Sequence, residues 1–169
     1  MRAALPDPQI RYAGPLYRAL NPVYARDPLS GMGAQRFGGR FNLQGRPALY
    51  TAMAVMGAVS EANQIGRPFE PVVLVSYDCD QDGLFDATDA NHLAVFGVDA
   101  ASLGANDWRL QMIRDGASYG QIFSERLIKA GYSGMIVPGF APGAAAGARN
   151  LVLWHWPRLK VIDTQGRLK

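Results

Sequence analysis

Residues 29–42 read LSGMGAQRFGGRFN, and this glycine-rich stretch constrains the fold more than any other segment. It lies within a run of turn-forming residues, 21–44, that also contains Asn-Pro and Asp-Pro pairs. Connections without regular structure rarely exceed about 12–15 residues unless they carry a function or are disordered. Leu29, Phe37 and Phe41 are apolar, so we expect them to attach this run to the core. The run is therefore interpreted as a functional loop.

The chemistry of this loop is open to two interpretations. Its four glycines allow the backbone to approach a ligand closely, and Arg36 and Arg40 could donate several hydrogen bonds to phosphate oxygens. A plain glycine turn with arginines on the surface fits the same residues. The pattern G-x-G-x-x-G is absent and no strand-to-helix crossover is predicted here, so neither a dinucleotide fingerprint nor a P-loop is indicated.

Apolar periodicity and capping residues predict short strands interleaved with helices. An arm, residues 1–15, precedes the first strand. The predicted strands are 16–20, 47–50, 71–78, 83–86, 135–138, 151–154 and 160–163. The predicted helices are 52–64 after the N-cap Thr51, a short helix from Asp89 to Phe96, another from Asp107 to Arg114, and 119–130 between Ser118 and Gly131. This order predicts an α+β fold in a single domain, residues 1–169.

The composition fits one globular domain with an ordinary core: 169 residues, 49% hydrophobic and 18% charged. The formal charge of +3 is spread along the chain, which is too weak a signal for direct binding of nucleic acid. Cys79 is the only cysteine, which excludes an internal disulfide and a cysteine-based zinc site. We see no pattern of a secretory signal or of a membrane span, and we expect a cytoplasmic protein.

Glu61 is the candidate acid because it stands among small and apolar residues on the predicted helix 52–64. A buried charge without compensation is strongly unfavourable. Two placements follow: Glu61 lies on the wet side of the helix, or it faces a cleft that contains a cationic partner. His92 and His155 are far apart, and no histidine or cysteine has metal-ligand spacing, so no zinc site is predicted.

Residues 78–89 raise a separate hypothesis, in which the chain is a calcium-binding interaction module. Residues 78–83, Asp-Cys-Asp-Gln-Asp-Gly, match the start of an EF-hand loop, and Asp89 occupies its twelfth position. The preceding segment is rich in β-branched residues rather than helical, and the last ligand would be Asp instead of the usual Glu. The alternative interpretation of Asp78, Asp80 and Asp82 is a solvated turn at the exit of a strand.

Several motifs together resemble the RES-domain family. They are Tyr17-Arg18, LSGxGA at 29–34, RFGGRFN at 36–42, Ala48-x-Tyr50 and Glu61, and the order Ser118, Val137-Pro138, Asn150-Leu151 extends the match along the chain. Members of this family are the toxins of RES/Xre toxin–antitoxin pairs, and the chain is similar to ParT-type members. The resemblance implies an ADP-ribosyltransferase-like fold, with a split β-sheet core and flanking helices, in a single RES domain.

The resemblance also implies a substrate and a set of site residues. The substrate is NAD+, cleaved at the nicotinamide–ribose bond, and no metal is required. The residues carried over position by position are Arg18, Arg40 with the neighbouring Gly39, Tyr50, Glu61 and Ser118. Glu61 would stabilise positive charge on the ribose, Tyr50 would stack on nicotinamide, and the two arginines would hold the diphosphate. Ser118, at a helix N-terminus, would help to position the nicotinamide amide or a phosphate.

Two protein partners follow from the resemblance. One is an Xre-like antitoxin that occludes the active cleft and supplies the DNA-binding function, so the toxin needs no direct contact with nucleic acid or membrane. The other is a protein acceptor for ADP-ribose, because ParT-like members are linked to mono-ADP-ribosylation of a nucleotide-biosynthesis enzyme such as ribose-phosphate pyrophosphokinase. Other members use water or phosphate as the acceptor and deplete NAD+, as an NAD+ glycohydrolase or phosphorylase does.

Overall fold

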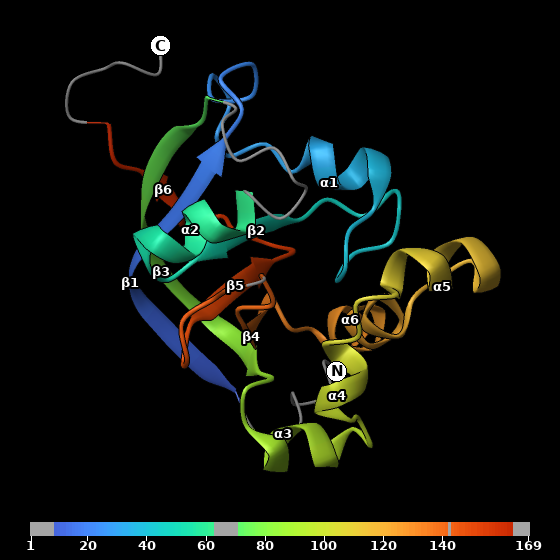
Figure 1. The fold of residues 1–169 in the computed structure, drawn as a ribbon. Coiled ribbons are helices and arrows are strands. Elements are labelled where there is room, and N and C mark those ends of the chain that lie inside the picture. The colour runs from blue at the N-terminus through green and yellow to red at the C-terminus, as the bar shows by residue number, and fades with distance from the viewer. Residues whose placement is uncertain (1–8, 63–70, 142, 164–169) are drawn as a thin grey trace.

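The computed structural model describes residues 9–62, 71–141 and 143–163 (Figure 1). Its strands are β1 (Ile10–Leu20), β2 (Leu49–Ala52), β3 (Val73–Asp86), β4 (Gly134–Pro138), β5 (Arg149–Leu153) and β6 (Lys160–Val161). Its helices are α1 (Met32–Phe37), α2 (Val55–Ala62), α3 (Ala90–Val95), α4 (Ala100–Leu103), α5 (Trp108–Asp115) and α6 (Tyr119–Ala130). None of these described helices has the length and apolarity to cross a bilayer. The predicted α+β fold is confirmed.

The sheet consists of two parts that meet along short contacts. In the first part, β1 pairs with β3 in antiparallel fashion over residues 10–20 and 73–84, and β6 adds to β3. In the second part, β5 lies between β2 and β4 and is antiparallel to both. The parts are joined by the pair Tyr17↔Ala52 between β1 and β2, and by a short parallel pairing of β3 with β4. The contact between β1 and β2 is therefore narrow.

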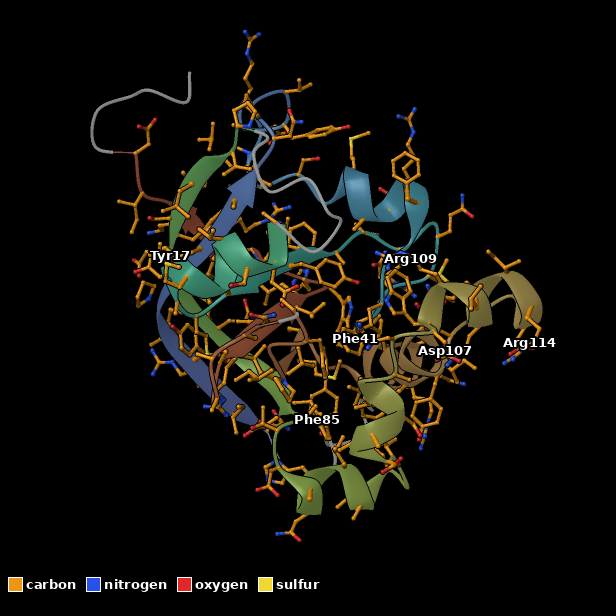
Figure 2. All side chains as sticks on the ribbon, viewed as in Figure 1. Tyr17, Phe41, Phe85, Asp107, Arg109 and Arg114 are labelled. Carbon is orange, nitrogen blue, oxygen red and sulfur yellow. The ribbon has the colours of Figure 1, made fainter. Side chains whose placement is uncertain are left out.

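Helices α3 to α6 gather on one side of the sheet (Figure 1). The buried cluster between them and the sheet is centred on Phe85 of β3. Its ring makes edge-on contacts with Phe96, Phe123 and Tyr132 at centroid distances of 5.3, 5.5 and 5.5 Å. Phe41 belongs to the same cluster and is 2% exposed. Figure 2 labels Phe41 and Phe85. The Phe41 side chain attaches the glycine-rich stretch to the core, as the sequence predicts.

Helix α6 follows its local signals. The hydroxyl of Ser118 accepts a hydrogen bond from the amide of Gln121, and the Gln121 side chain accepts one from the amide of Ser118, which forms a capping box. Gly131 ends the helix with a left-handed φ of 100°. The prediction for residues 119–130 is confirmed, and so is the short helix that follows the cap Asp89.

Tertiary contacts override several local signals. Thr51 does not cap a helix: it lies in β2, and its hydroxyl donates to the carbonyl of Leu151 in the neighbouring strand at 2.8 Å. Helix α2 consequently begins later than predicted. The predicted strands 71–78 and 83–86 form one continuous strand, β3, which pairs with β1 along most of its length.

Two short helices, α1 and α4, were not predicted: α1 lies in the run interpreted as a loop, and α4 lies between the two helices predicted after Asp89 and Asp107. Helix α1 runs through the glycine-rich stretch, and Phe37 at its end is 69% exposed, so the expectation that Phe37 packs in the core is wrong. The predicted arm, residues 1–15, is strand from Ile10 onward. Residues 1–8 of the arm, and positions 63–64 of the predicted helix, lie outside the described residues.

Candidate active site

A cavity of ≈ 430 Å³ lies beside the narrow contact between β1 and β2. Its walls come from β1, β2, α2, α5, the turn that follows α1, and residues on and near β4 and β5. The lining includes five of the residues carried over from the family resemblance: Arg18, Gly39, Arg40, Tyr50 and Glu61. The volume falls within the range of about 300–1,000 Å³ that small-molecule sites occupy. Segments far apart in the sequence thus converge on one pocket.

The turn after α1 is built around Gly39. Two backbone hydrogen bonds join Gly39 and Asn42, from Gly39 N to Asn42 O at 3.0 Å and from Asn42 N to Gly39 O at 3.4 Å. A Cβ atom on Gly39 would lie 2.6 Å from the hydroxyl of Tyr50 and 2.7 Å from Oδ1 of Asn42. No side chain fits in this space, so glycine is required for a steric reason. Arg40 and Phe41 form the tip of the turn.

The buried side chain of Asn42 fixes the turn on both sides. Its Nδ2 donates to the carbonyls of Ala34 and Arg46 at 2.8 and 2.9 Å, which closes the loop around α1. Its Oδ1 accepts from the hydroxyl of Tyr50 at 2.6 Å, and that hydroxyl accepts from the amide of Phe41 at 3.0 Å. Burial raises the pKa of Tyr50, so the hydroxyl remains a protonated donor. Tyr50 is therefore a fixed part of the cavity wall.

The guanidinium group of Arg40 is held in place before any ligand arrives. Its Nη1 donates to the carbonyl of Ala105 at 2.8 Å. The group also lies 4.8 Å from the ring centroid of Phe140 and 5.8 Å from that of Trp108. Burial lowers the pKa of Arg40, while the charge of Glu61 acts in the opposite direction. A guanidinium stays charged near neutral pH in any case, so the cavity contains a fixed cation.

Two further guanidinium groups line the cavity. Arg18 extends from β1, and its Nη1 donates to a backbone carbonyl of the segment before α1 at 3.2 Å. Arg109 extends from the first turn of α5 and lies 4.2 Å from the ring centroid of Trp108. Its charge contributes to the lowered pKa of Arg40. With Glu61, the charged side chains among the described lining residues are three arginines and one carboxylate, which favours an anionic ligand.

Glu61 lies at the end of α2 and lines the cavity. Of its two predicted placements, the structure therefore has the one in a cleft. Its Oε1 accepts a hydrogen bond of 2.7 Å from Nδ2 of Asn150 on β5. Ala58 and Ala62 of the same helix also line the cavity, and their small side chains leave room beside the carboxylate. Its charge opposes the lowering of the Arg40 pKa by burial, so the cationic partner that a carboxylate in a cleft requires is present.

Ser118 does not join these residues. It is 0% exposed and is absent from the described residues that line the cavity. Its hydroxyl is instead engaged in the cap of α6, where it accepts from the amide of Gln121 at 3.2 Å. The position carried over from the resemblance is therefore a helix cap, and the expected direct contact of Ser118 with nicotinamide or phosphate does not follow from this arrangement.

The calcium hypothesis is wrong because its residues lie on a strand. Asp78, Asp80 and Asp82 are alternate residues of the extended strand β3, so they share its outer face in a row and do not form the compact loop that wraps around a calcium ion. Asp80 pairs with Arg11 at 2.7 Å, Asp82 pairs with Arg158 at 3.2 Å, and the side chain of Asp89 caps α3. Within the described part of the chain, no group of three or more histidine, cysteine or acidic side chains could hold a metal ion.

Three lining residues, Trp108, Arg109 and Phe140, were not predicted from the sequence, and Asn150 entered only as part of the family pattern. The sequence did predict the start of α5 at Asp107, but neither the aromatic residue nor the arginine that follows has a spacing rule that would place it in a site. Their role becomes visible only when α5 is packed beside Arg40.

Comparison with known proteins identifies a family and solved structures of similar fold. The sequence model of the RES domain matches residues 15–168. A chain in the crystal structure of the M. tuberculosis MbcT–MbcA toxin–antitoxin complex is similar in fold, with a TM-score of 0.68. The match covers 92% of this chain and 84% of that chain at 23% sequence identity. None of the curated proteins matches in sequence.

The contacts of the Tyr50 hydroxyl predict a stability effect. Replacement Tyr50→Phe should lower the free energy of unfolding by about 1–3 kcal/mol, because Asn42 Oδ1 and the Phe41 amide each lose a buried partner. Replacement Tyr12→Phe is the control: its hydroxyl bonds to the carbonyl of Pro15 at the surface, and the loss should be smaller. Urea unfolding measures both, and equal losses would contradict the assignment.

The same tyrosine predicts a pH dependence. Burial raises the pKa of Tyr50 in the folded chain, so above the unfolded value of about 10 the unfolded chain releases its proton first. The contribution of Tyr50 to stability is therefore complete below pH 10 and is lost as the pH rises further. The difference between the parent protein and Tyr50→Phe should shrink in that range, and a difference that grows would contradict the prediction.

Proposed function

Because this chain belongs to the RES-domain family, we propose that it is the toxin of a toxin–antitoxin pair, and that its cavity binds NAD+ and cleaves the nicotinamide–ribose bond. One observation carries the proposal: Arg40 and Glu61 line the same cavity. A dinucleotide presents a diphosphate, which needs cations, and a ribose that becomes positively charged during cleavage, which needs a carboxylate. Both are present within one pocket.

The arginines supply the binding energy in this proposal. Arg18 and Arg40 bind the diphosphate through charge-assisted hydrogen bonds, each contributing about 1.5–3 kcal/mol. The guanidinium of Arg40 is already fixed by Ala105 and Phe140, so little side-chain freedom is lost when the substrate binds. Arg109, at the exposed edge of the cavity, adds a third positive charge.

In this proposal Glu61 is the catalytic carboxylate. Cleavage breaks the bond between C1′ of the ribose and the nicotinamide nitrogen. The electron pair leaves with nicotinamide, which becomes neutral, and positive charge develops on the ribose as in glycoside hydrolysis. The carboxylate of Glu61 stabilises that charge, and Asn150 orients it in advance through the 2.7 Å hydrogen bond. No proton donor is needed because the leaving group is neutral.

In this proposal the aromatic ring of Tyr50, rather than its hydroxyl, contacts the substrate. Its hydroxyl is occupied by Asn42 and Phe41, and burial keeps it protonated by raising its pKa. We therefore assign the aromatic ring to stacking against nicotinamide, a contact in which geometry rather than proton transfer matters. Gly39 contributes by letting the turn approach this ring.

The partner in the proposal is an Xre-type antitoxin that covers the cavity. The similar fold comes from a complex described as toxin with antitoxin. Large apolar side chains are exposed on three of the helices that contribute to the cavity or adjoin it: Met32 and Phe37 on α1, Met56 on α2, and Leu110 and Ile113 on α5. Exposed apolar surface of this kind is typical of protein interfaces. It supports a partner that covers the mouth of the cavity.

The acceptor of the ribosyl group completes the proposed function. We favour transfer of ADP-ribose to a protein, of the class of ribose-phosphate pyrophosphokinase, as the similarity to ParT-type members implies. One observation favours inorganic phosphate as a second candidate. The described lining carries three guanidinium groups, and phosphate is an anionic nucleophile that needs no general base. Either acceptor forms a bond to C1′ as nicotinamide leaves.

Replacement Glu61→Gln tests the catalytic assignment. It should lower kcat for nicotinamide release by about 100- to 1,000-fold, because the charge is lost while size and the contact with Asn150 are retained. The matched control is Glu125→Gln, which removes a carboxylate paired with Arg46 outside the cavity, and which should keep parental kcat. Parental release by the Glu61 variant would refute the site.

Replacement Arg109→Ala tests the outer binding group. We expect KM for NAD+ to rise by about 3- to 10-fold with little change in kcat, and to depend less on salt, because an exposed charge acts through screened attraction. Arg114→Ala on the same helix is the control. Its side chain lies at the outer end of α5 and pairs with Asp115, so KM should not change (Figure 2). Equal shifts in both variants would contradict a specific role.

Labelled NAD+ distinguishes the acceptors. The purified toxin is incubated with NAD+ labelled in its adenylate part, with host lysate and with or without phosphate. A labelled protein band that is missing with Glu61→Gln is the expected result for transfer to protein. If the product is free ADP-ribose phosphate and its amount increases with added phosphate, the acceptor is phosphate and transfer to protein is refuted. If the product is free ADP-ribose alone, the acceptor is water.

A further inference from the structure

The first turn of α6 is in direct contact with the backbone that carries Arg40. At Gly120, an added Cβ atom would lie 2.7 Å from the carbonyl oxygen of Arg40 and 3.1 Å from the ring of Phe41. The helix thus approaches the tip of the turn as closely as main-chain atoms allow. A contact this close transmits any displacement of the helix to Arg40.

Gln121, the next residue of α6, binds both sides of the same turn. Its Nε2 donates to the carbonyl of Gly39 at 2.9 Å and to that of Asn42 at 3.1 Å. Its Oε1 accepts from the amide of Ser118 at 2.9 Å. The side chain is 0% exposed, so water cannot replace these partners. One amide group therefore closes the turn whose tip is Arg40 and Phe41.

We propose that Gln121 is a positioning residue that holds the guanidinium of Arg40 where it binds the diphosphate, an inference that rests on the proposed function. The hydrogen bonds of Gln121 fix the backbone on both sides of Arg40, and the contacts with Ala105 and Phe140 then fix the end of the side chain. Ser118 acts through this residue, because the capping box orients the Gln121 amide. Small displacements of a binding group are costly to its function.

A role in stability alone would have a different kinetic consequence. Loss of folded protein lowers the apparent kcat in proportion and leaves KM unchanged. Displacement of a group that binds the diphosphate weakens NAD+ binding and therefore raises KM. The ratio of these two effects separates positioning from general support of the fold.

The first experiment replaces Gln121 by Met, which has a similar shape but cannot donate to the two carbonyls. KM for NAD+ should rise about 10-fold while kcat changes by less than about 3-fold. The control is Ser124→Ala on the same helix, also 0% exposed, whose hydroxyl donates to the carbonyl of Gly120 at 2.8 Å. Its KM should be parental. In an Arg40→Ala background, Gln121→Met should have no further effect on KM, because the two act as one unit.

A second variant, Gln121→Glu, keeps the acceptor for the Ser118 amide and covers the case in which the Met variant does not fold. Its buried carboxyl faces two carbonyl oxygens, so its protonated form is favoured and can donate one hydrogen bond to the turn. Its kcat/KM relative to the parent should therefore increase several-fold as the pH falls from about 8 to about 5.5. A flat ratio would contradict the donor role.

Amide hydrogen exchange gives a readout that does not depend on catalysis. The amide of Gly39 bonds to the carbonyl of Asn42, so its exchange should accelerate in both Gln121 variants and not in Ser124→Ala. Parental KM with Gln121→Met, or with Gln121→Glu at pH 8, would overturn the inference, and so would unchanged exchange at Gly39. If the parent protein releases no nicotinamide, the proposed function fails, and calorimetric affinity for NAD+ then takes the place of KM: a parental affinity in the variants, or none in the parent, overturns the inference as well.

Discussion

The buried carboxamide of Asn42 is the constraint on which the candidate site depends. A buried amide that lacks a partner costs about 1–3 kcal/mol per group, so its environment must supply donors and acceptors in fixed positions. Here the amide nitrogen closes the loop around α1, and the oxygen accepts from Tyr50. Gly39 has to be glycine because the hydroxyl oxygen of Tyr50 and Oδ1 of Asn42 occupy the place of its side chain. Arg40 then lines the cavity from a turn that these hydrogen bonds and close contacts hold in place.

The elements whose signals are local could be predicted from the sequence. Helix α6 has a serine cap, an amphipathic repeat and a terminal glycine, and these signals agree with its packing. Thr51 shows why other predictions failed. Its hydroxyl is equally suited to a helix cap and to a strand partner, and the pairing of β2 with β5, decided by distant residues, selects the strand. Phe37 failed for a related reason, since α1 turns it outward while Phe41 takes the place in the core.

For the site, the sequence predicted which residues share a chemistry but not how they are held. Arg40 and Glu61 were identified through a family pattern. Their convergence depends on tertiary contacts that no local signal shows, namely those of Arg40 with Ala105 and Phe140 and that of Glu61 with Asn150. Ser118 was placed in the site by the same pattern, although its hydroxyl serves the capping box of α6. Arg109 was missed because its role comes from the packing of α5. Rules based on residue spacing in the sequence cannot predict tertiary contacts of this kind.

The central claim is that one cavity binds the diphosphate at its arginines and the nicotinamide ribose at its carboxylate. The most direct measurement is a crystal structure of the protein with a carbocyclic NAD+ analogue, in which the bond to nicotinamide cannot be cleaved. The account predicts phosphate oxygens within hydrogen-bonding distance of Arg18 and Arg40, and the nicotinamide end beside Glu61 and the Tyr50 ring. An analogue bound outside this cavity, or bound with its diphosphate directed away from Arg40, would contradict it.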